Sequence, residues 1–281
     1  MKHPLLATIP RRTIYGAQVV RCRAAALGRQ FIDLLFPPRC LLCEVEEPTV
    51  QSAVLLCDTC RAELLQSAGS YCPRCGAAGG GAAAEGATEA QPNSSCVECR
   101  NRRFQFDRVV RLGSYDGALR EAVLRMKHPR DEPLARAVAE LFWDRCASEW
   151  STLEVDCVVP VPLHWWRWLR RGTSSPQTIA ACLGRRLGVP VIDDSLVRVR
   201  DTQPQGGLAA IRRRQNVRGA FELRGDKNWI RARRVLVVDD VLTSGATADE
   251  MSRVLKRAGA AWVAVATIAR TPDPRLIGAA R

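Results

Sequence analysis

Residues 234–251 read RVLVVDDVLTSGATADEM, and the fold of the second half of the chain can be inferred from this stretch outward. Its apolar start predicts a buried strand over 235–238, followed by two acids, Asp239 and Asp240. The loop 243–247 then leads into a predicted helix over 247–258. Small residues let backbone N–H groups surround a phosphate, hydroxyls add donors, and a helix N-terminus adds a positive dipole. The stretch therefore predicts a phosphate-binding loop behind a strand.

Apolar strands alternate with helices on both sides of this stretch. Further strands are predicted over 109–112, 155–161 and 261–268, and further helices over 117–127, 133–150 and 176–187. Such alternation favours a parallel sheet with helices on both faces. Ligands of these sheets bind at the carboxyl ends of the strands, where the acids and the loop would lie. We expect this α/β domain to span residues 106–281.

Eight of the twelve cysteines form four Cys-x-x-Cys pairs. The pairs are Cys40/Cys43, Cys57/Cys60, Cys72/Cys75 and Cys96/Cys99. The two-residue gap lets both sulfurs point at one ion, and a second pair completes the tetrahedron that zinc prefers. The longer gaps between pairs favour two consecutive zinc ribbons, although an interleaved pairing stays open. We expect two structural zinc ions in a small domain over 36–105, behind an N-terminal extension, 1–35, with a short helix over 24–36.

The net charge of +13 is unevenly distributed along the chain. Residues 1–39 carry +6, residues 40–107 carry −4, and residues 108–281 carry +11. Charged residues make up 25% and hydrophobic residues 47%, which excludes a wholly disordered chain. No apolar run approaches the roughly 18 residues that cross a bilayer. The N-terminus lacks a secretory signal, so we expect a cytoplasmic protein, with an organelle transit peptide as the alternative.

The stretch 234–251 resembles the 5-phosphoribosyl 1-pyrophosphate (PRPP) signature of type I phosphoribosyltransferases. In that family the acids lie beside the ribose hydroxyls and the loop cradles the 5-phosphate. The resemblance therefore makes Asp239 and Asp240 the candidate catalytic residues, with ribose binding as their expected role. It assigns the phosphate to Thr243, Ser244, Gly245, Ala246 and Thr247. The implied fold is a type I phosphoribosyltransferase-like parallel sheet with flanking helices, preceded by the double zinc ribbon.

Three further blocks narrow the resemblance. They are FPPRCLLC (36–43), VPVPLHWWRWLRRG (159–172) and DTQPQGGLAAIRRRQNVRGAF (201–221). With the cysteine pairs in front, they make the chain similar to the ComF family, which is associated with competence and joins a double zinc ribbon to a phosphoribosyltransferase domain. The resemblance implies a pyrophosphate-binding loop with Val161 and Pro162, a phosphate contact from Lys127, and a hood with Gln205 and Arg218.

The resemblance implies binding of PRPP with Mg²⁺, in support of DNA uptake (natural transformation) or of nucleotide-linked metabolism. It leaves open whether phosphoribosyl transfer takes place, and the acceptor is not readable from the residues. The family usually shows Arg-Gly-Phe-Asn-Gln after the pyrophosphate loop, whereas residues 171–175 read RGTSS. This departure leaves the nucleobase or acceptor contact at that place unassigned.

The alternative is a catalytically inactive module that reuses the fold to bind single-stranded DNA or a protein partner. Residues 160–235 carry sixteen Lys and Arg against five acids, and three tryptophans interleave with arginines over 165–171. Aromatic rings that stack on bases, among arginines that hold phosphates, are typical of single-strand binding. The same tryptophans would equally suit an interdomain packing patch. The family resemblance adds a DNA-uptake helicase as a partner.

Overall fold

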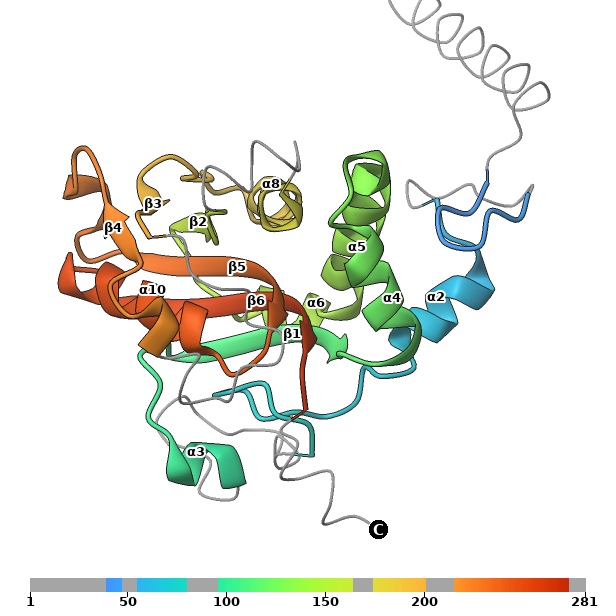
Figure 1. Cartoon of the computed structure of the whole chain (residues 1–281), viewed down its shortest axis with the longest axis horizontal. Coiled ribbons are helices and arrows are strands. Elements are labelled where there is room, and N and C mark those ends of the chain that lie inside the picture. The colour runs from blue at the N-terminus through green and yellow to red at the C-terminus, as the bar shows by residue number, and fades with distance from the viewer. Residues whose placement is uncertain (1–38, 47–54, 80–95, 164–173, 201–214, 273–281) are drawn as a thin grey trace, which may run out of the picture.

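The computed structural model describes residues 39–46, 55–79, 96–163, 174–200 and 215–272 (Figure 1). Some of the predicted features fall outside these ranges. They are the N-terminal extension with its helix, the tryptophan and arginine cluster over 165–171, and the hood residue Gln205. None of the described helices is both long enough and apolar enough to cross a membrane.

A four-stranded parallel sheet forms the centre of the described chain. In spatial order its strands are β1 (Arg108–Ser114), β6 (Trp262–Arg270), β5 (Arg234–Leu242) and β2 (Cys157–Pro160). The strands are rich in valine and buried on both sides, which is typical of a parallel sheet covered by helices. The predicted parallel sheet is therefore confirmed.

Helices cover both faces of this sheet (Figure 1). One face carries α4 (Gly117–Arg125), α5 (Glu132–Arg145) and α8 (Ser175–Leu187), and the other carries α10 (Ala246–Arg257). Successive strand side chains point to opposite faces. Leu236 and Val238 therefore belong to the core under α5, the α5-side core, while Val235 and Val237 belong to the α10-side core.

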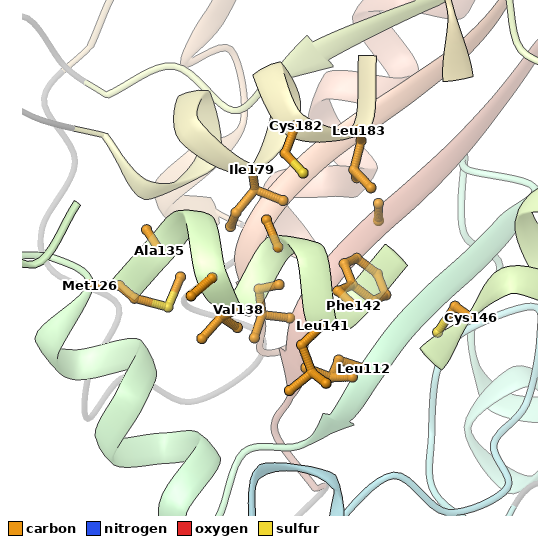
Figure 2. Close-up of a cluster of buried hydrophobic side chains, with 14 of the residues drawn as sticks. Leu112, Met126, Ala135, Val138, Leu141, Phe142, Cys146, Ile179, Cys182 and Leu183 are labelled. Carbon is orange, nitrogen blue, oxygen red and sulfur yellow. The ribbon is translucent and has the colours of Figure 1, made fainter. Parts of the chain in front are cut away.

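The α5-side core is built mainly where α5 meets α8. Figure 2 shows Phe142 of α5 below Leu183 of α8, with Ile179 of α8 above α5 and Val138 on the opposite side of α5. All four side chains are fully buried, and each such side chain contributes about 1.5–3 kcal/mol through burial. This packing holds α8 and α5 together over one face of the sheet.

The helix predicted over 133–150 is interrupted. The structure has α5, which ends at Arg145, and a separate short helix, α6 (Ala147–Ser151). Between them Cys146 leaves helical geometry, with φ −104° and ψ 30°, and its thiol donates to the Arg111 carbonyl. The break lets Trp150 fold back edge-on against Phe142, with ring centroids 5.1 Å apart. Packing on β1 thus overrides a continuous helical pattern.

The remaining elements are short. They are α2 (Asp58–Leu65), α3 (Val97–Asn101), η1 (Pro129–Asp131), η2 (Asn228–Ile230) and the antiparallel pair β3 (Leu196–Arg198) and β4 (Phe221–Leu223). Figure 1 shows α2 beside α4, whereas α3 lies beyond the other side of the strands. The cysteine segments that include α2 and α3 therefore reach opposite faces of the sheet, because their buried cysteines belong to different cores.

Candidate functional site

The eight paired cysteines gather into two groups of four. The first tetrad is Cys40, Cys43, Cys57 and Cys60, and the second is Cys72, Cys75, Cys96 and Cys99. Within each tetrad the four sulfurs lie within 4.8 Å of one another. The structure therefore groups the pairs consecutively, and the interleaved arrangement does not occur.

The sulfur spacing fits zinc. Zinc–sulfur bonds of about 2.3 Å in a tetrahedron place neighbouring sulfurs about 3.8 Å apart. The sulfurs of Cys43 and Cys57 are 3.7 Å apart, those of Cys72 and Cys99 are 3.8 Å apart, and those of Cys75 and Cys96 are 3.5 Å apart. Four thiolates close a site to further ligands, so both tetrads fit structural zinc ions.

The first tetrad is attached to α4. Cys57 is the N-cap of α2, and its sulfur accepts from the Cys60 backbone N–H. The turn between Cys40 and Cys43 is the knuckle of the first ribbon. The Arg125 guanidinium, at the end of α4, donates to two carbonyls of this knuckle, those of Leu41 and Leu42, at 2.8 Å each. The same guanidinium pairs with Asp131 at 3.1 Å. Arg125 therefore attaches the knuckle of the first ribbon to α4, and Lys127 follows Arg125 by two residues.

The second tetrad sits directly on the edge strand β1. The turn between Cys72 and Cys75 is the knuckle of the second ribbon. Gly76, directly after it, adopts φ +75°, a backbone conformation that residues other than glycine rarely take. A Cβ at Gly76 would also lie 2.9 Å from the side chain of Val109 on β1. The Val109 N–H donates to the carbonyl of Pro73 in the knuckle, at 2.7 Å. The second ribbon thus packs in contact with the sheet.

The acid pair lies where β5 outruns its neighbour β2. Pairing between these strands ends at Pro160 and Val238, while pairing of β5 with β6 continues to Leu242. Asp239 and Asp240 are consequently paired on one side only. The predicted strand 235–238 is four residues too short at this end. The apolar run stops at Val238, whereas backbone pairing with β6 continues to Leu242.

Electrostatics within the acid pair are unfavourable to two charges. Burial, and then the neighbouring Asp240, raise the pKa of Asp239 to about 8. The Asp239 carboxylate accepts a hydrogen bond from the Asp240 backbone N–H at 2.9 Å. Lys127 lies 3.8 Å from the Asp240 carboxylate and partly offsets the negative charge. A cation at this place would relieve the repulsion further.

The phosphate loop, residues 243–247, joins β5 to α10. Gly245 takes φ +75° and is the N-cap of α10, so the N-cap residue itself has no side chain to cap the helix, and the Ser244 hydroxyl accepts from the Ala246 N–H at 3.4 Å. Ser244, Gly245 and Ala246 are buried, so the loop backbone is held closely from behind. The N-terminus of such a helix presents backbone N–H groups that can bind an anion.

The other predicted site residues are placed unequally. Val161 follows β2 directly, and its N–H donates to the Val238 carbonyl at 2.8 Å, so Val161 and Pro162 lie beside the acid pair. Lys127 is brought to the same place. Arg218 is different: its side chain is exposed, and its backbone carbonyl accepts from Arg200 rather than meeting the acid pair. Gln205 lies outside the described residues.

Three residues behind the phosphate loop were not predicted. Arg270, the last residue of β6, donates to the carbonyls of Leu242 and Thr243 and pairs with Glu98. Arg102 donates to the Ser244 carbonyl at 2.6 Å. A charged residue that ends an apolar strand beside a predicted phosphate loop is the one local signal that pointed to Arg270. Glu98, inside the fourth cysteine pair, offered no such signal.

Comparison with known proteins finds two domain models along the chain. A family model for a double zinc ribbon domain matches residues 31–100, and a model for a phosphoribosyl transferase domain matches residues 177–276. Among solved structures, adenine phosphoribosyltransferase from Saccharomyces cerevisiae is 16% identical and shares 52% of this chain and 73% of its own, with a TM-score of 0.33. A likeness this slight adds nothing to the argument.

Two curated relatives match most of the chain. "Competence protein F" of Haemophilus influenzae is 32% identical over 76% of this chain and 90% of its own length. "DNA utilization protein YhgH" of Salmonella typhimurium is 30% identical over 85% of this chain and 99% of its own length. Both domain models and these long matches agree with the two cysteine tetrads and the phosphate loop. The chain therefore belongs to the ComF family, in which a double zinc ribbon precedes a phosphoribosyltransferase domain.

Proposed function

We propose that the carboxyl end of β5 binds PRPP with Mg²⁺, and that this binding serves the uptake or use of DNA. One observation carries the ligand assignment: the acid pair, the phosphate loop at the N-terminus of α10 and Lys127 lie together at the carboxyl end of β5. The names of the relatives, a competence protein and a DNA utilization protein, support the DNA part.

The arrangement divides the ligand into three parts. The phosphate loop and the α10 N-terminus suit the 5-phosphate, because N–H groups and the helix dipole favour an anion. The acid pair suits the ribose hydroxyls, which donate to carboxylates. Lys127, across the gap where β2 ends, suits the pyrophosphate through its charge. Val161 and Pro162 line the same place, where the Val161 N–H is already donated to the Val238 carbonyl and proline has no N–H. The loop, the acid pair and Lys127 therefore each have the opposite hydrogen-bonding or charge character to the part of the ligand assigned to them.

The acid pair also suits a hydrated magnesium ion. Hard oxygen ligands are what Mg²⁺ prefers, and it keeps several waters in such sites. The raised pKa of Asp239 reflects its burial first and the neighbouring Asp240 second, and a divalent cation would favour ionisation of both carboxylates. When bound, Mg²⁺ would neutralise charge on the pyrophosphate.

If the protein is an enzyme, the bond from the ribose C1 to the pyrophosphate oxygen breaks, and a bond from C1 to the acceptor forms. Pyrophosphate leaves with the bonding electron pair. Lys127 is the described cation placed to stabilise that developing charge, since it lies beside Asp240. Release of pyrophosphate in the presence of candidate acceptors, compared with PRPP alone, measures whether this transfer takes place.

Calorimetric titration with PRPP and Mg²⁺ tests the ligand assignment. We expect wild-type protein to bind, and Lys127→Met to bind at least about tenfold more weakly, because a charge-assisted contact is lost. Lys256→Met is a matched control. Lys256 pairs with Asp107 at the opposite end of α10, and its side chain is as exposed as that of Lys127, 31% against 29%.

Equal weakening by both substitutions would mean a general charge effect and would contradict the site assignment. Absence of PRPP binding to wild-type protein that retains its zinc would refute the assignment altogether.

The DNA-binding alternative makes a separate prediction. Single-stranded oligonucleotide affinity should fall steeply with salt, because bound counterions are released from the phosphates. Replacement of Arg170 and Arg171, which lie outside the described residues, should flatten that dependence. An affinity that does not respond to salt would argue against direct contact with DNA and in favour of a protein partner.

A further inference from the structure

The side chain of Arg270 joins the second zinc ribbon to the phosphate loop. On the ribbon side it donates to the Glu98 carboxylate at 2.6 Å and to the Cys75 carbonyl at 3.3 Å. On the loop side it donates to the Thr243 carbonyl, and to that of Leu242 at 3.2 Å. A further bond reaches the Thr271 carbonyl at 2.7 Å. One guanidinium therefore connects a metal-binding knuckle with the backbone that precedes α10.

Both partners of the ion pair are withdrawn from water. The Arg270 side chain is 5% exposed and that of Glu98 is 4% exposed. A buried charge without a partner is strongly unfavourable, so each residue depends on the other. The planar fork of arginine can serve several acceptors at fixed angles, which a lysine ammonium cannot do.

Three further contacts attach the same ribbon to the same loop. Arg102 donates to the Ser244 carbonyl at 2.6 Å, and the Gln105 N–H donates to the Asp249 carboxylate at 2.5 Å. The Phe104 ring lies 3.2 Å from where a Cβ at Gly245 would stand. The ribbon end 102–105 therefore closes the back of the loop and the first turn of α10.

These contacts set the direction of the loop amides. In a planar trans peptide the C=O and the following N–H point in opposite directions. The carbonyls of Thr243 and Ser244 are held by Arg270 and Arg102. The N–H groups of Ser244 and Gly245 must then point away from the two arginines, toward the open side of the loop. That is the direction in which an anion at the α10 N-terminus would lie.

We propose that Arg270, kept in place by Glu98, and Arg102 are positioning residues that orient the phosphate-loop N–H groups toward a phosphate monoester. The second zinc ribbon thereby serves as the back wall of the phosphate site. This inference rests on the proposed function only for the identity of the ligand. The orientation of the amides can be measured in its absence.

Two measurements test the inference on the full-length zinc-loaded protein. One is hydrogen exchange of the amides in 243–247 without any ligand. The other is calorimetric titration with ribose 5-phosphate. The variants are Glu98→Gln, which removes the partner charge, and Arg270→Lys, which keeps the charge but loses the fork. Arg102→Lys, at a half-buried side chain, is the milder variant in case the buried pair is needed for folding.

Glu140→Gln is the matched control. Glu140 is also a buried acid, and it pairs with Arg185 and Arg186 between α5 and α8, away from the phosphate loop. We expect Glu140→Gln to lower stability but to leave loop exchange and ribose 5-phosphate affinity at wild-type values. The three ribbon variants should each raise exchange of the Ser244 and Gly245 amides and weaken the affinity, by about tenfold in both cases.

Ribbon variants that fold, retain both zinc ions and keep wild-type exchange and affinity would overturn the inference. Equal effects from Glu140→Gln would overturn it as well, because the contacts would then act only through stability. If wild-type protein does not bind ribose 5-phosphate while the ribbon variants still raise loop exchange, the positioning role stands and the ligand assignment fails.

Discussion

Asp239 shows how much a single residue depends on its surroundings. A carboxyl group at the end of a strand is ordinary in a sequence. Here burial and the adjacent Asp240 raise the pKa of Asp239 to about 8. The folded protein therefore holds a proton at neutral pH that the unfolded chain, with an aspartate pKa of about 3.9, has released. The site stores electrostatic strain that a bound cation would relieve.

This pKa predicts a pH-dependent gain in stability for Asp239→Asn. Because the folded state binds the extra proton, wild-type stability falls as pH rises from about 4 to about 8. Asparagine does not ionise, so the variant should exceed the wild type by about 1 kcal/mol or more at pH 8 and by less at pH 5. Urea unfolding at both pH values measures this, and a difference that does not vary with pH would contradict it.

At the scale of elements, β5 is longer than its apolar run. The run ends at Val238, but backbone pairing with β6 continues through Asp239 opposite Thr267 to Leu242 opposite Arg270. An apolar pattern detects only those strand residues whose side chains pack in a core. Asp239 and Asp240 belong to neither core, so the pattern did not predict the end of the strand. The extension carries the strand directly into the phosphate loop and leaves little slack between them.

Gly245, at the boundary between the phosphate loop and α10, is sensitive to substitution. It takes φ +75°, and Phe104 leaves little room for a Cβ. Gly245→Ala should therefore cost about 1–2 kcal/mol of stability and weaken ribose 5-phosphate binding. Gly225→Ala is the matched control, because Gly225 has φ +71° and a Cβ there would meet no atom within 4 Å. It should cost similar stability without affecting binding, and equal binding losses would contradict this.

At the scale of the whole molecule, the two ribbons support the site from opposite faces. Arg125 connects the knuckle of the first ribbon to α4, which precedes Lys127. Arg270 connects the knuckle of the second ribbon to the phosphate loop. Buried cysteines of each tetrad belong to the core on its own face of the sheet. Each ribbon therefore packs into the core on one face of the sheet.

Metal removal should consequently affect the whole protein. We expect two zinc ions per chain by elemental analysis, and strong chelation should lower the thermal unfolding temperature of the sheet as well as release the ribbons. Cys182→Ala, at a buried cysteine outside both tetrads, should retain the full zinc content. Protein purified without chelators that holds no metal, or a sheet that unfolds at the same temperature without zinc, would contradict the prediction.

Much of the fold followed from local patterns. The four strands of the parallel sheet and the helices that cover it were predicted from the apolar patterns of their residues, and α8 begins near its proline as predicted. The short elements α2, α3, β3 and β4 were not predicted. The break at Cys146 was not predicted, since it arises from contacts of Cys146 with Arg111 and of Trp150 with Phe142. The strand order and the placement of the ribbons on opposite faces likewise depend on contacts between distant segments.

The Cys-x-x-Cys pairs and the acid pair followed by a glycine-containing hydroxyl loop are visible in the sequence, because the residues within each of them are only a few positions apart. Which cysteine pairs combine into a tetrad, and which residues support the phosphate loop, depend on contacts between distant segments. Glu98 and Arg270 are 172 positions apart, and they meet because β6 lies beside β1, on which the second ribbon packs. The order of the strands decides which distant charges can pair, and that order cannot be read from the spacing of neighbouring residues.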